Sequence, residues 1–375
     1  MQPPARPTRR NFLWLAGIAA AACALPPLLA GCQPVEYEAA ANRARQPAKP
    51  DDQDLHTLVR LATLAPSGHN TQPWKFRISP AAIQIYPDLT RRVPVVDPDD
   101  RELWISLGGA LENLLVAAEY YGYQTETTYQ LAGTPDDHIS IALGRISPKQ
   151  PRQPDLFEAI PQRQSTRSEY DRQPVPTATL NRLAAAATGA GVAPLIFTGA
   201  AAMEPLRQYV NAGNEQQLTA DEFKAELIKW LRFTDREAVA ALDGLASGAT
   251  GNPKVPRWLA QLFIGRALNP EAQNRKDNLH IRSSSGLLLF ASQTNDQAAW
   301  IETGRAYERF ALLATSRNIK NAFINQPCEV PELRAQVQAH LSLNGAFPQL
   351  LVRFGYGPAM PRSLRRPVGQ VLLAA

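Results

Sequence analysis

The sequence predicts an α+β fold made of two related halves. Helix-like and strand-like apolar patterns alternate from about residue 52 onward, and the order helix, turn, strand occurs twice. Residues 59–64 lead into a strand at 74–78, and residues 180–187 lead through Thr188–Gly191 into a strand at 193–197. We interpret this order as a degenerate internal repeat, in which one chain folds as its own dimer. A coincidence of helix and strand order is the alternative interpretation.

The N-terminal segment 1–31 is predicted to be an export signal. Arg9-Arg10 precedes an uncharged, alanine-rich run from Leu13 to Ala30, and the arginine pair resembles a twin-arginine signal. The ending Leu29-Ala30-Gly31-Cys32 resembles a bacterial lipobox, which predicts a lipid on Cys32. The competing interpretation is a transmembrane anchor, and Pro26-Pro27 argues against a stable span. We expect an exported lipoprotein on the periplasmic side, at the outer membrane if the cell is Gram-negative, because Gln33 rather than an acid follows Cys32.

Charge and cysteine usage narrow the class of protein. The formal net charge is +5, and loss of the three arginines before residue 32 lowers it to +2. No basic run is interleaved with aromatic residues, so nucleic acid is not an expected partner. Cys328 is the one cysteine beyond Cys32, and the five histidines lack metal spacing, so neither disulfides nor a metal centre is expected. Residues 32–51 are polar and rich in alanine and proline, which predicts a flexible tether.

The first half is predicted to span residues 52–150. A long, mostly apolar helix is expected at 102–121, where Gly108-Gly109 would permit close approach of another backbone. A linker rich in proline and glutamine, 148–154, ends this half. The other expected elements are a helix at 55–64, a hairpin of 76–78 with 83–86, and strands at 125–131 and 138–144.

The second half is predicted to span residues 151–375, with a helical insertion at about 200–282. Residues 244–256 are rich in Gly, Ser and Pro, and are interpreted as a lid or, alternatively, a plain surface insertion. Helices are expected at 155–160, 180–187, 203–210, 220–230, 235–242, 258–268, 297–316 and 332–341. Buried strands are expected at 286–290 and 349–354.

Two short segments carry groups suited to a ligand. The turn from Ala65 to Trp74 offers hydroxyl, amide and backbone N–H groups, which suit a planar ligand with many heteroatoms. The segment Arg163-Gln164-Ser165-Thr166-Arg167 brackets two hydroxyls with two arginines, which suits a phosphate. A plain loop and a solvated basic loop are the respective alternatives. The candidate contacts in the turn are Pro66, Ser67, Gly68, Asn70 and Gln72, with His69 more typical of a loop residue.

The turn resembles the Ala-Pro-Ser-x-x-Asn-x-Gln-Pro-Trp segment of nitroreductase-type flavoproteins, and most of residues 52–370 resembles their fused, single-chain Acg-like branch, with the middle resembling it least. The resemblance implies a nitroreductase-like fold and one FMN per chain. It implies that Arg163 and Ser165 contact the FMN phosphate, that Thr166 belongs to the same segment, and that Arg167 reaches the ribityl chain and pyrimidine edge. It places Asn325 and Gln326 beside the flavin ring and Arg365 and Arg366 at the phosphate.

The expected function is that of an FMN-dependent oxidoreductase. Flavin supplies the hydride chemistry, so no catalytic acid or base is assigned. The expected acceptor is a nitroaromatic, quinone or similar flat molecule. NAD(P)H is not expected outside the cytoplasm, so an exported protein would take electrons from a membrane quinol or a redox partner. A protein that sequesters FMN without turnover is the alternative.

Overall fold

The fold is built around two four-stranded antiparallel sheets. The computed structural model describes residues 37–46, 54–145 and 153–374. The first sheet has the order β1-β2-β4-β3 and the second the order β5-β8-β10-β9, so each follows the order first, second, fourth, third along its half. The strands are β1 Trp74–Ser79, β2 Ala82–Pro87, β3 Tyr123–Gln130, β4 His138–Arg145, β5 Val192–Thr198, β8 Gly286–Ser292, β9 Lys320–Phe323 and β10 Phe347–Gly355.

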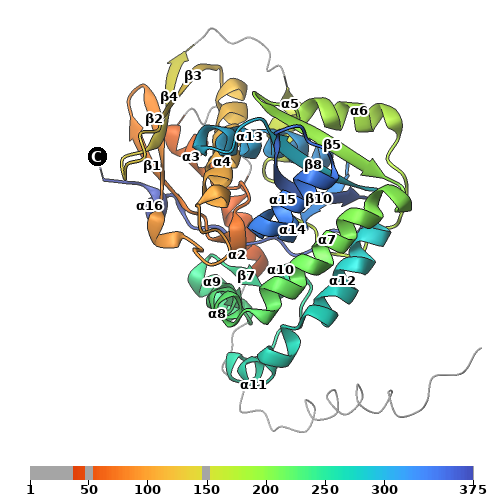
Figure 1. Ribbon diagram of the computed structural model, residues 1–375. Coiled ribbons are helices and arrows are strands. Elements are labelled where there is room, and N and C mark those ends of the chain that lie inside the picture. Colours follow the sequence, from red (N-terminus) through yellow and green to blue (C-terminus); the bar gives the residue numbers. More distant parts are fainter. Residues whose placement is uncertain (1–36, 47–53, 146–152, 375) are drawn as a thin grey trace, which may run out of the picture. The chain divides into compact units, whose positions relative to one another are not determined.

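Two long helices, α4 (Arg101–Tyr120) and α13 (Gln297–Ser316), occupy equivalent places in the two halves. Each has 20 residues and joins the second strand of its sheet to the third. The two helices pack along each other between the sheets (Figure 1). A Cβ atom at Gly108 would lie 2.0 Å from the Ile301 carbonyl oxygen, and one at Gly304 would lie 1.9 Å from that of Ile105. Glycine is therefore required at both sides of the crossing, as expected for Gly108.

The core is continuous across both halves. Trp74 and Phe76 of β1 belong to the same buried cluster as Phe310 of α13 and Phe354 of β10. All seven residues of β8 are buried, which confirms the fully buried strand expected there. Burying apolar area from both sheets against one helix pair makes the halves interdependent for stability.

A helical insertion separates β5 from β8, as expected for about 200–282. Its helix α7 is continuous over 20 residues, whereas the sequence predicted only 203–210, because its outer part lacks a clear apolar period. Helix α12 was not predicted individually. Its N-cap is Asn269, whose side chain accepts a hydrogen bond from the Ala272 N–H, and Pro270 is its first residue. The elements are α7 Ala200–Thr219, α8 Asp221–Trp230, β6 Leu231–Arg232, α9 Asp235–Ala241, β7 Leu245–Ala246, α10 Ser247–Thr250, α11 Arg257–Ala267 and α12 Pro270–Ser283.

The expected flexible tether at 32–51 contains a helix, so that prediction is wrong for its central part. Helix α2 (Tyr37–Ala44) buries Tyr37, Ala40 and Ala41 against Ala238 of α9 and Leu364. The spacing i, i+3, i+4 places these three residues on one face. The rest of the tether, the signal with Cys32, and most of the 148–154 linker lie outside the described residues.

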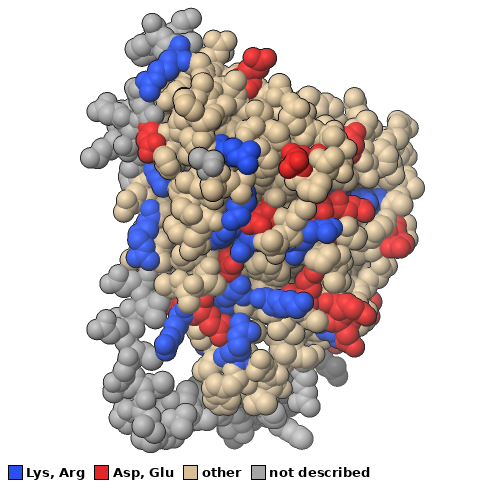
Figure 2. All heavy atoms as spheres, turned by 90° about the vertical axis from the view of Figure 1, so that its left-hand side faces the viewer, with Lys and Arg blue, Asp and Glu red and all other residues tan. Residues whose placement is uncertain are grey.

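The remaining short elements are α3 Leu55–Ala62, η1 Gly68–Asn70, η2 Leu89–Arg91, α5 Pro154–Ala159, α6 Thr177–Ala186, α14 Gln326–Glu329, α15 Pro331–His340 and α16 Val368–Val371. Among these, α3, α5, α6 and α15 match the expected helices at 55–64, 155–160, 180–187 and 332–341, whereas η1, η2, α14 and α16 were not predicted. Among the described residues, no helix combines the length and apolar character needed to cross a membrane. Figure 2 shows Lys/Arg and Asp/Glu side chains interspersed on one face, without a continuous surface of one sign.

Candidate functional site

The turn after α3 has backbone conformations that residues other than glycine rarely adopt. His69, Asn70 and Gln72 have φ values of 47°, 54° and 54°, in the left-handed region. The Gln72 N–H donates to Ser67 Oγ at 2.9 Å, which closes the turn. Gly68 lies so close to α4 that a Cβ there would be 3.3 Å from a Glu102 carboxylate oxygen. Strained backbone of this kind is held only where surrounding contacts determine it.

Asn70 is clamped between the insertion and the C-terminal segment. Its amide nitrogen donates to the carbonyl oxygens of Gly244 at 3.1 Å and Leu364 at 3.2 Å. Its amide oxygen accepts from Arg365 Nη1 at 2.8 Å. The side chain is buried, and both its amide nitrogen and its amide oxygen are engaged in these contacts.

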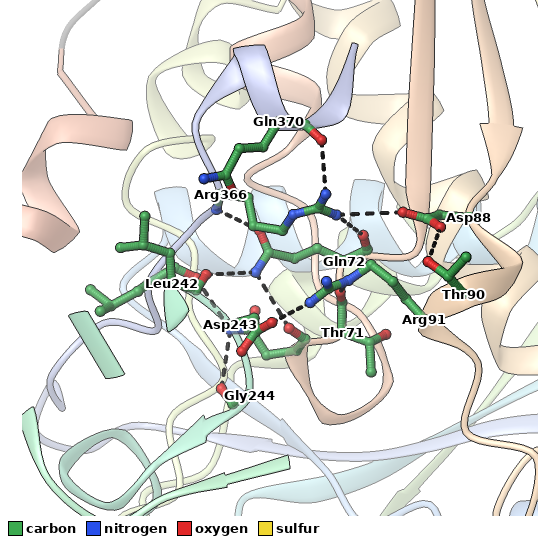
Figure 3. Close-up of polar contacts among 12 residues, drawn as sticks. Thr71, Gln72, Asp88, Thr90, Arg91, Leu242, Asp243, Gly244, Arg366 and Gln370 are labelled. Carbon is green, nitrogen blue, oxygen red and sulfur yellow. Dashed lines mark hydrogen bonds and ion pairs between the residues drawn. The ribbon is translucent and has the colours of Figure 1, made fainter. Parts of the chain in front are cut away.

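Gln72 makes the equivalent contacts on the other side of the turn (Figure 3). Its amide nitrogen donates to the Leu242 carbonyl oxygen at 2.9 Å, and its amide oxygen accepts from the Arg366 N–H at 2.8 Å. Arg366 in turn reaches the Gln72 carbonyl oxygen and lies 3.7 Å from Asp88. The two amides predicted to face a ligand therefore also hold the strap Leu242–Gly244 and the C-terminal segment in place.

The structure brings the two predicted ligand segments together. Arg163, after α5, donates from Nη2 to the Leu64 carbonyl oxygen at 2.7 Å. Arg365 donates to the carbonyl oxygens of Leu64 and Ala65 at 3.1 and 3.0 Å. Residues about a hundred positions apart thus meet at the start of the turn, as the sequence predicted.

The Arg163 side of this junction is buried and carries unsatisfied polar atoms. Arg163 Nε lies 3.0 Å from Glu308 Oε1, at an angle that makes an ion pair rather than a hydrogen bond. Burial raises the pKa of Glu308 to about 7, against the opposing effect of Arg163. Four buried guanidinium nitrogens here lack a hydrogen-bond partner, namely Arg45 Nε, Arg163 Nε, Arg163 Nη1 and Arg365 Nε.

The central residues of the second segment add to the edge of the second sheet. Ser165 forms a parallel bridge with Asn321 of β9, and the Thr166 N–H donates to the Asn321 carbonyl oxygen at 2.8 Å. Thr166 is fully buried, and its hydroxyl has no hydrogen-bond partner. This pairing fixes the positions from which Arg163 and Arg167 project.

The Arg167 side holds a second basic cluster. Within the described part of the chain, Arg167 makes no hydrogen bond or ion pair. Burial lowers its pKa, and the charge of Arg353 adds to that effect. Burial also lowers the pKa of His69 to about 4 and that of His280 to about 3, with the charges of Arg167 and, for His280, Arg353 and Lys276 acting in the same direction. We call Arg167, Lys276, His280 and Arg353 the ring-side cluster.

Arg353 on β10 is the anchor of the ring-side cluster. Its Nη2 donates to the carbonyl oxygens of Thr166 at 3.1 Å and Ser168 at 2.8 Å. Its guanidinium carbon lies 4.0 Å from the centre of the Tyr170 ring, a cation–π contact. Its Nη1 is buried without a partner. An arginine held by two carbonyls with one free donor is suited to a ligand oxygen.

Helix α12 contributes the other members of the cluster. Its C-terminal end is fixed because the Tyr170 N–H donates to Ser283 Oγ at 3.1 Å. Asp277, the acid next to Lys276, accepts from Asn214 at 2.9 Å and from Gln326 at 3.2 Å. The insertion therefore supplies site residues rather than only a cover.

The remaining predicted contacts have structural partners. The Asn325 side chain donates to Glu102 and accepts from the Leu351 N–H at 2.9 Å, while the Gln326 side chain holds Asp277 and Asn214. The sequence predicted backbone contacts here, and that role stays a prediction, as do the ligand roles of Pro66, Ser67 and Gly68. Arg365 and Arg366 lie where the turn meets the C-terminal segment.

Sequence reasoning missed the contributions of Lys276, Asp277, His280, Glu308 and Arg353. Arg353 lies within the apolar sequence of strand β10. An arginine at a position predicted to be buried was the signal that could have identified it. Lys276 and His280 lie four residues apart on α12, in a polar helix that carried no ligand motif.

These features define an α+β protein with a polar, cation-rich site where the turn after α3, the segment after α5 and strand β10 meet. The chain matches the model described as "Nitroreductase family" over residues 160–356. It is 30% identical over 330 residues to the Mycobacterium tuberculosis H37Rv protein named "Putative NAD(P)H nitroreductase Rv3131", covering 86% of this chain and 92% of the relative. The chain belongs to the nitroreductase family.

Further relatives are more distant. The M. tuberculosis H37Rv protein named "Putative NAD(P)H nitroreductase acg" is 22% identical over 338 residues, covering 84% of this chain and 94% of the relative. Among solved structures, the FMN-dependent nitroreductase NfnB from Mycobacterium smegmatis in complex with NADPH is 14% identical. It aligns over 59% of this chain and 98% of its own, with a TM-score of 0.40.

Proposed function

We propose that the protein is an FMN-dependent oxidoreductase that reduces a flat acceptor such as a nitroaromatic or a quinone. The observation that carries the proposal is the junction of the Ala65–Trp74 turn with the Arg163–Arg167 segment, flanked by unpaired cationic donors. Membership of the nitroreductase family supports it.

The residues present fit the two ends of FMN. At the phosphate end, the unpaired nitrogens of Arg163 and Arg365 could bind phosphate oxygens, and Arg45 of the N-terminal segment adds a third guanidinium. Glu308 would oppose an anion when ionised, but its pKa of about 7 leaves much of it neutral at neutral pH. Ser165 and Thr166 add hydroxyl donors.

At the ring end, the ring-side cluster supplies positive charge. Bound FMN would supply two-electron hydride chemistry. Arg167 and Arg353 would hold the pyrimidine edge, and their charges favour negative charge on the reduced ring. Seven predicted contacts would lie around the ring, namely Pro66, Ser67, Gly68, Asn70, Gln72, Asn325 and Gln326, while Arg366 would lie with Arg365 at the phosphate.

We further propose that residues 52–150 and 151–375 are two fused copies of one ancestral subunit. Identical strand order in the two sheets and the reciprocal glycine contacts of α4 and α13 support this relation. A two-fold interface makes residue i contact j and j contact i, as Gly108–Ile301 and Gly304–Ile105 do. The first half lacks the arginine segment and the second lacks the polar turn, so one FMN per chain is expected.

For localisation, we propose export and lipid attachment at Cys32, supported by the residues before it. The two relatives carry the name "Putative NAD(P)H nitroreductase", but an exported protein would need a donor available outside the cytoplasm, such as a membrane quinol or a redox partner. In cell fractionation, Cys32→Ser should release the protein from membranes. If the Cys32→Ser variant stays on the membrane as the unmodified protein does, the proposed lipid attachment is contradicted.

A second candidate function is FMN sequestration without turnover. The clamping of Asn70 and Gln72 by the strap and the C-terminal segment favours it, because the chain's own backbone closes over the turn. Restricted access would keep a bound flavin from donors and acceptors.

The first experiment tests FMN binding by the chain purified from Gln33 onward, whose described part forms one compact unit. We expect a yellow protein with one FMN per chain. Arg167→Gln should weaken FMN binding at least about tenfold, the value of a charge-assisted hydrogen bond. Arg182→Gln, on the exposed face of α6, is the matched control. A colourless protein that ignores added FMN would overturn the proposal.

The second experiment separates turnover from sequestration. The FMN-loaded protein is mixed anaerobically with NAD(P)H or with a reduced quinone analogue, and flavin absorbance is followed. Bleaching by either donor and recovery on adding a nitroaromatic or quinone support the enzyme. A flavin that no donor reduces within minutes supports sequestration.

A further inference from the structure

Helix α11 displays large apolar side chains to solvent. Trp258, Leu262 and Phe263 are 66%, 68% and 55% exposed. Trp258 and Leu262 lie one turn apart, as do Leu259 and Phe263, so the four residues share one side of the helix. Such a cluster on a folded chain marks a surface that another phase or molecule covers. Figure 1 shows α11 at the lower end of the molecule, away from both sheets.

The helix is held only along a narrow strip. Ala260 is its buried side chain among those described, and its first residue Arg257 pairs with Glu237 of α9 at 3.1 Å. The sequence from residue 244 to 270 contains three basic residues and no acid, and two of the three are paired with acids of α9: Lys254 with Asp235 at 2.7 Å and Arg257 with Glu237. An exposed aromatic and aliphatic helix face in a stretch without acids matches the composition of helices that lie in a membrane interface, with the buried apolar area as the main source of binding.

The position of α11 relative to the start of the fold points to the same occupant. Lys254 Nζ lies 5.9 Å from the centre of the Tyr37 ring, so the segment that leads into α11 adjoins the first described residue. Tyr37 is five residues after Cys32, and a chain of that length spans at most about 18 Å. A lipid on Cys32 would therefore hold this part of the protein, α11 included, within reach of the bilayer.

We propose that α11 is a membrane-contacting helix, with Trp258, Leu262 and Phe263 inserted among lipid headgroups and upper acyl chains. Trp and Phe are well suited to that boundary, because each combines a large apolar area with a flat shape. The proposal concerns a surface and does not require that the protein be an enzyme.

The test uses the chain from Gln33 onward, which lacks Cys32, so a lipid at that position cannot contribute. It is co-sedimented with vesicles of phosphatidylglycerol and phosphatidylcholine. We expect W258S/L262S/F263S to bind about a hundredfold more weakly than the unmodified chain. The matched control is L89S/V95S, which alters apolar residues that are 46% and 44% exposed elsewhere. All five side chains are exposed, so both variants should fold.

Tryptophan fluorescence gives a second readout that identifies the residue. Trp258 is the exposed tryptophan among the described residues, since Trp74, Trp104 and Trp300 are buried and Trp230 is half-buried. Brominated lipids should quench the Trp258 emission, and Trp258→Phe should remove that quenching while retaining binding. Three results would overturn the proposal: no vesicle binding, equal loss in L89S/V95S, or vesicle-independent self-association of the chain that W258S/L262S/F263S abolishes in sedimentation velocity.

Discussion

The contact of α4 with α13 makes a sharp prediction about two adjacent glycines. A Cβ at Gly108 would lie 2.0 Å from the Ile301 carbonyl oxygen, and real Cβ atoms do not come within 3.0 Å of other atoms. Gly108→Ala must therefore move the two helices apart by about 1 Å along a buried contact. A Cβ at Gly109 meets nothing nearer than 3.6 Å, an ordinary contact with Ala65.

The expected cost of Gly108→Ala is about 3 kcal/mol or more of unfolding free energy, the upper range for overpacking in a core. Gly109→Ala should be neutral or stabilising by about 0.5–1 kcal/mol, because alanine favours the helix. Both are measured by urea unfolding of the chain from Gln33, followed by circular dichroism. Equal stability of the two variants would refute the packing argument. Gly304→Ala should repeat the Gly108→Ala result from the other helix, if the contact is reciprocal.

Two other predictions concern buried polar groups. The pKa of Glu308 is raised from 4.5 to about 7, so the folded state binds the Glu308 proton more tightly than the unfolded state does. The protonated Glu308 therefore contributes to stability below about pH 4.5, and this contribution is lost as the pH rises to about 7. The unmodified chain should lose roughly 3 kcal/mol over that window through this group, and Glu308→Gln should not; parallel pH profiles of unfolding would contradict the shift. Gln72→Leu leaves the Leu242 carbonyl oxygen and the Arg366 N–H without their partner, so it should cost about 2–4 kcal/mol and speed hydrogen exchange at residues 242–246. Exposed Gln124→Leu is the control, and unchanged exchange in the Gln72 variant would show that the strap is held by other contacts.

Patterns within single segments predicted most of the secondary structure. Alternation and apolar runs located every strand of the two sheets except β9, which was not predicted, and α13 was predicted with the bounds it has in the structure. The errors lie where local pattern is weak. Helix α12 is polar along most of its length, and the N-terminal helix α2 has few large apolar residues, so their packing partners in other parts of the chain stabilise them.

The division into halves was predictable as an order of elements but not as separate folding units. Strand order repeats, whereas the buried core runs through both halves. Local sequence determines which segments are strands, but the partner helix decides which apolar faces meet. The glycine requirement at Gly304 became visible only once α4 was packed against it.

The sequence alone determined the family resemblance and the two segments that meet at the site, because short turns and arginine clusters are encoded by adjacent residues. Only the tertiary structure decided how those residues are used. Asn70 and Gln72 bind the strap and the C-terminal segment, and Arg353 and His280 join Arg167 from a strand and a helix distant in sequence. Burial and charge proximity are properties of packing, so the partners and pKa values of these groups cannot be read from spacing along the chain.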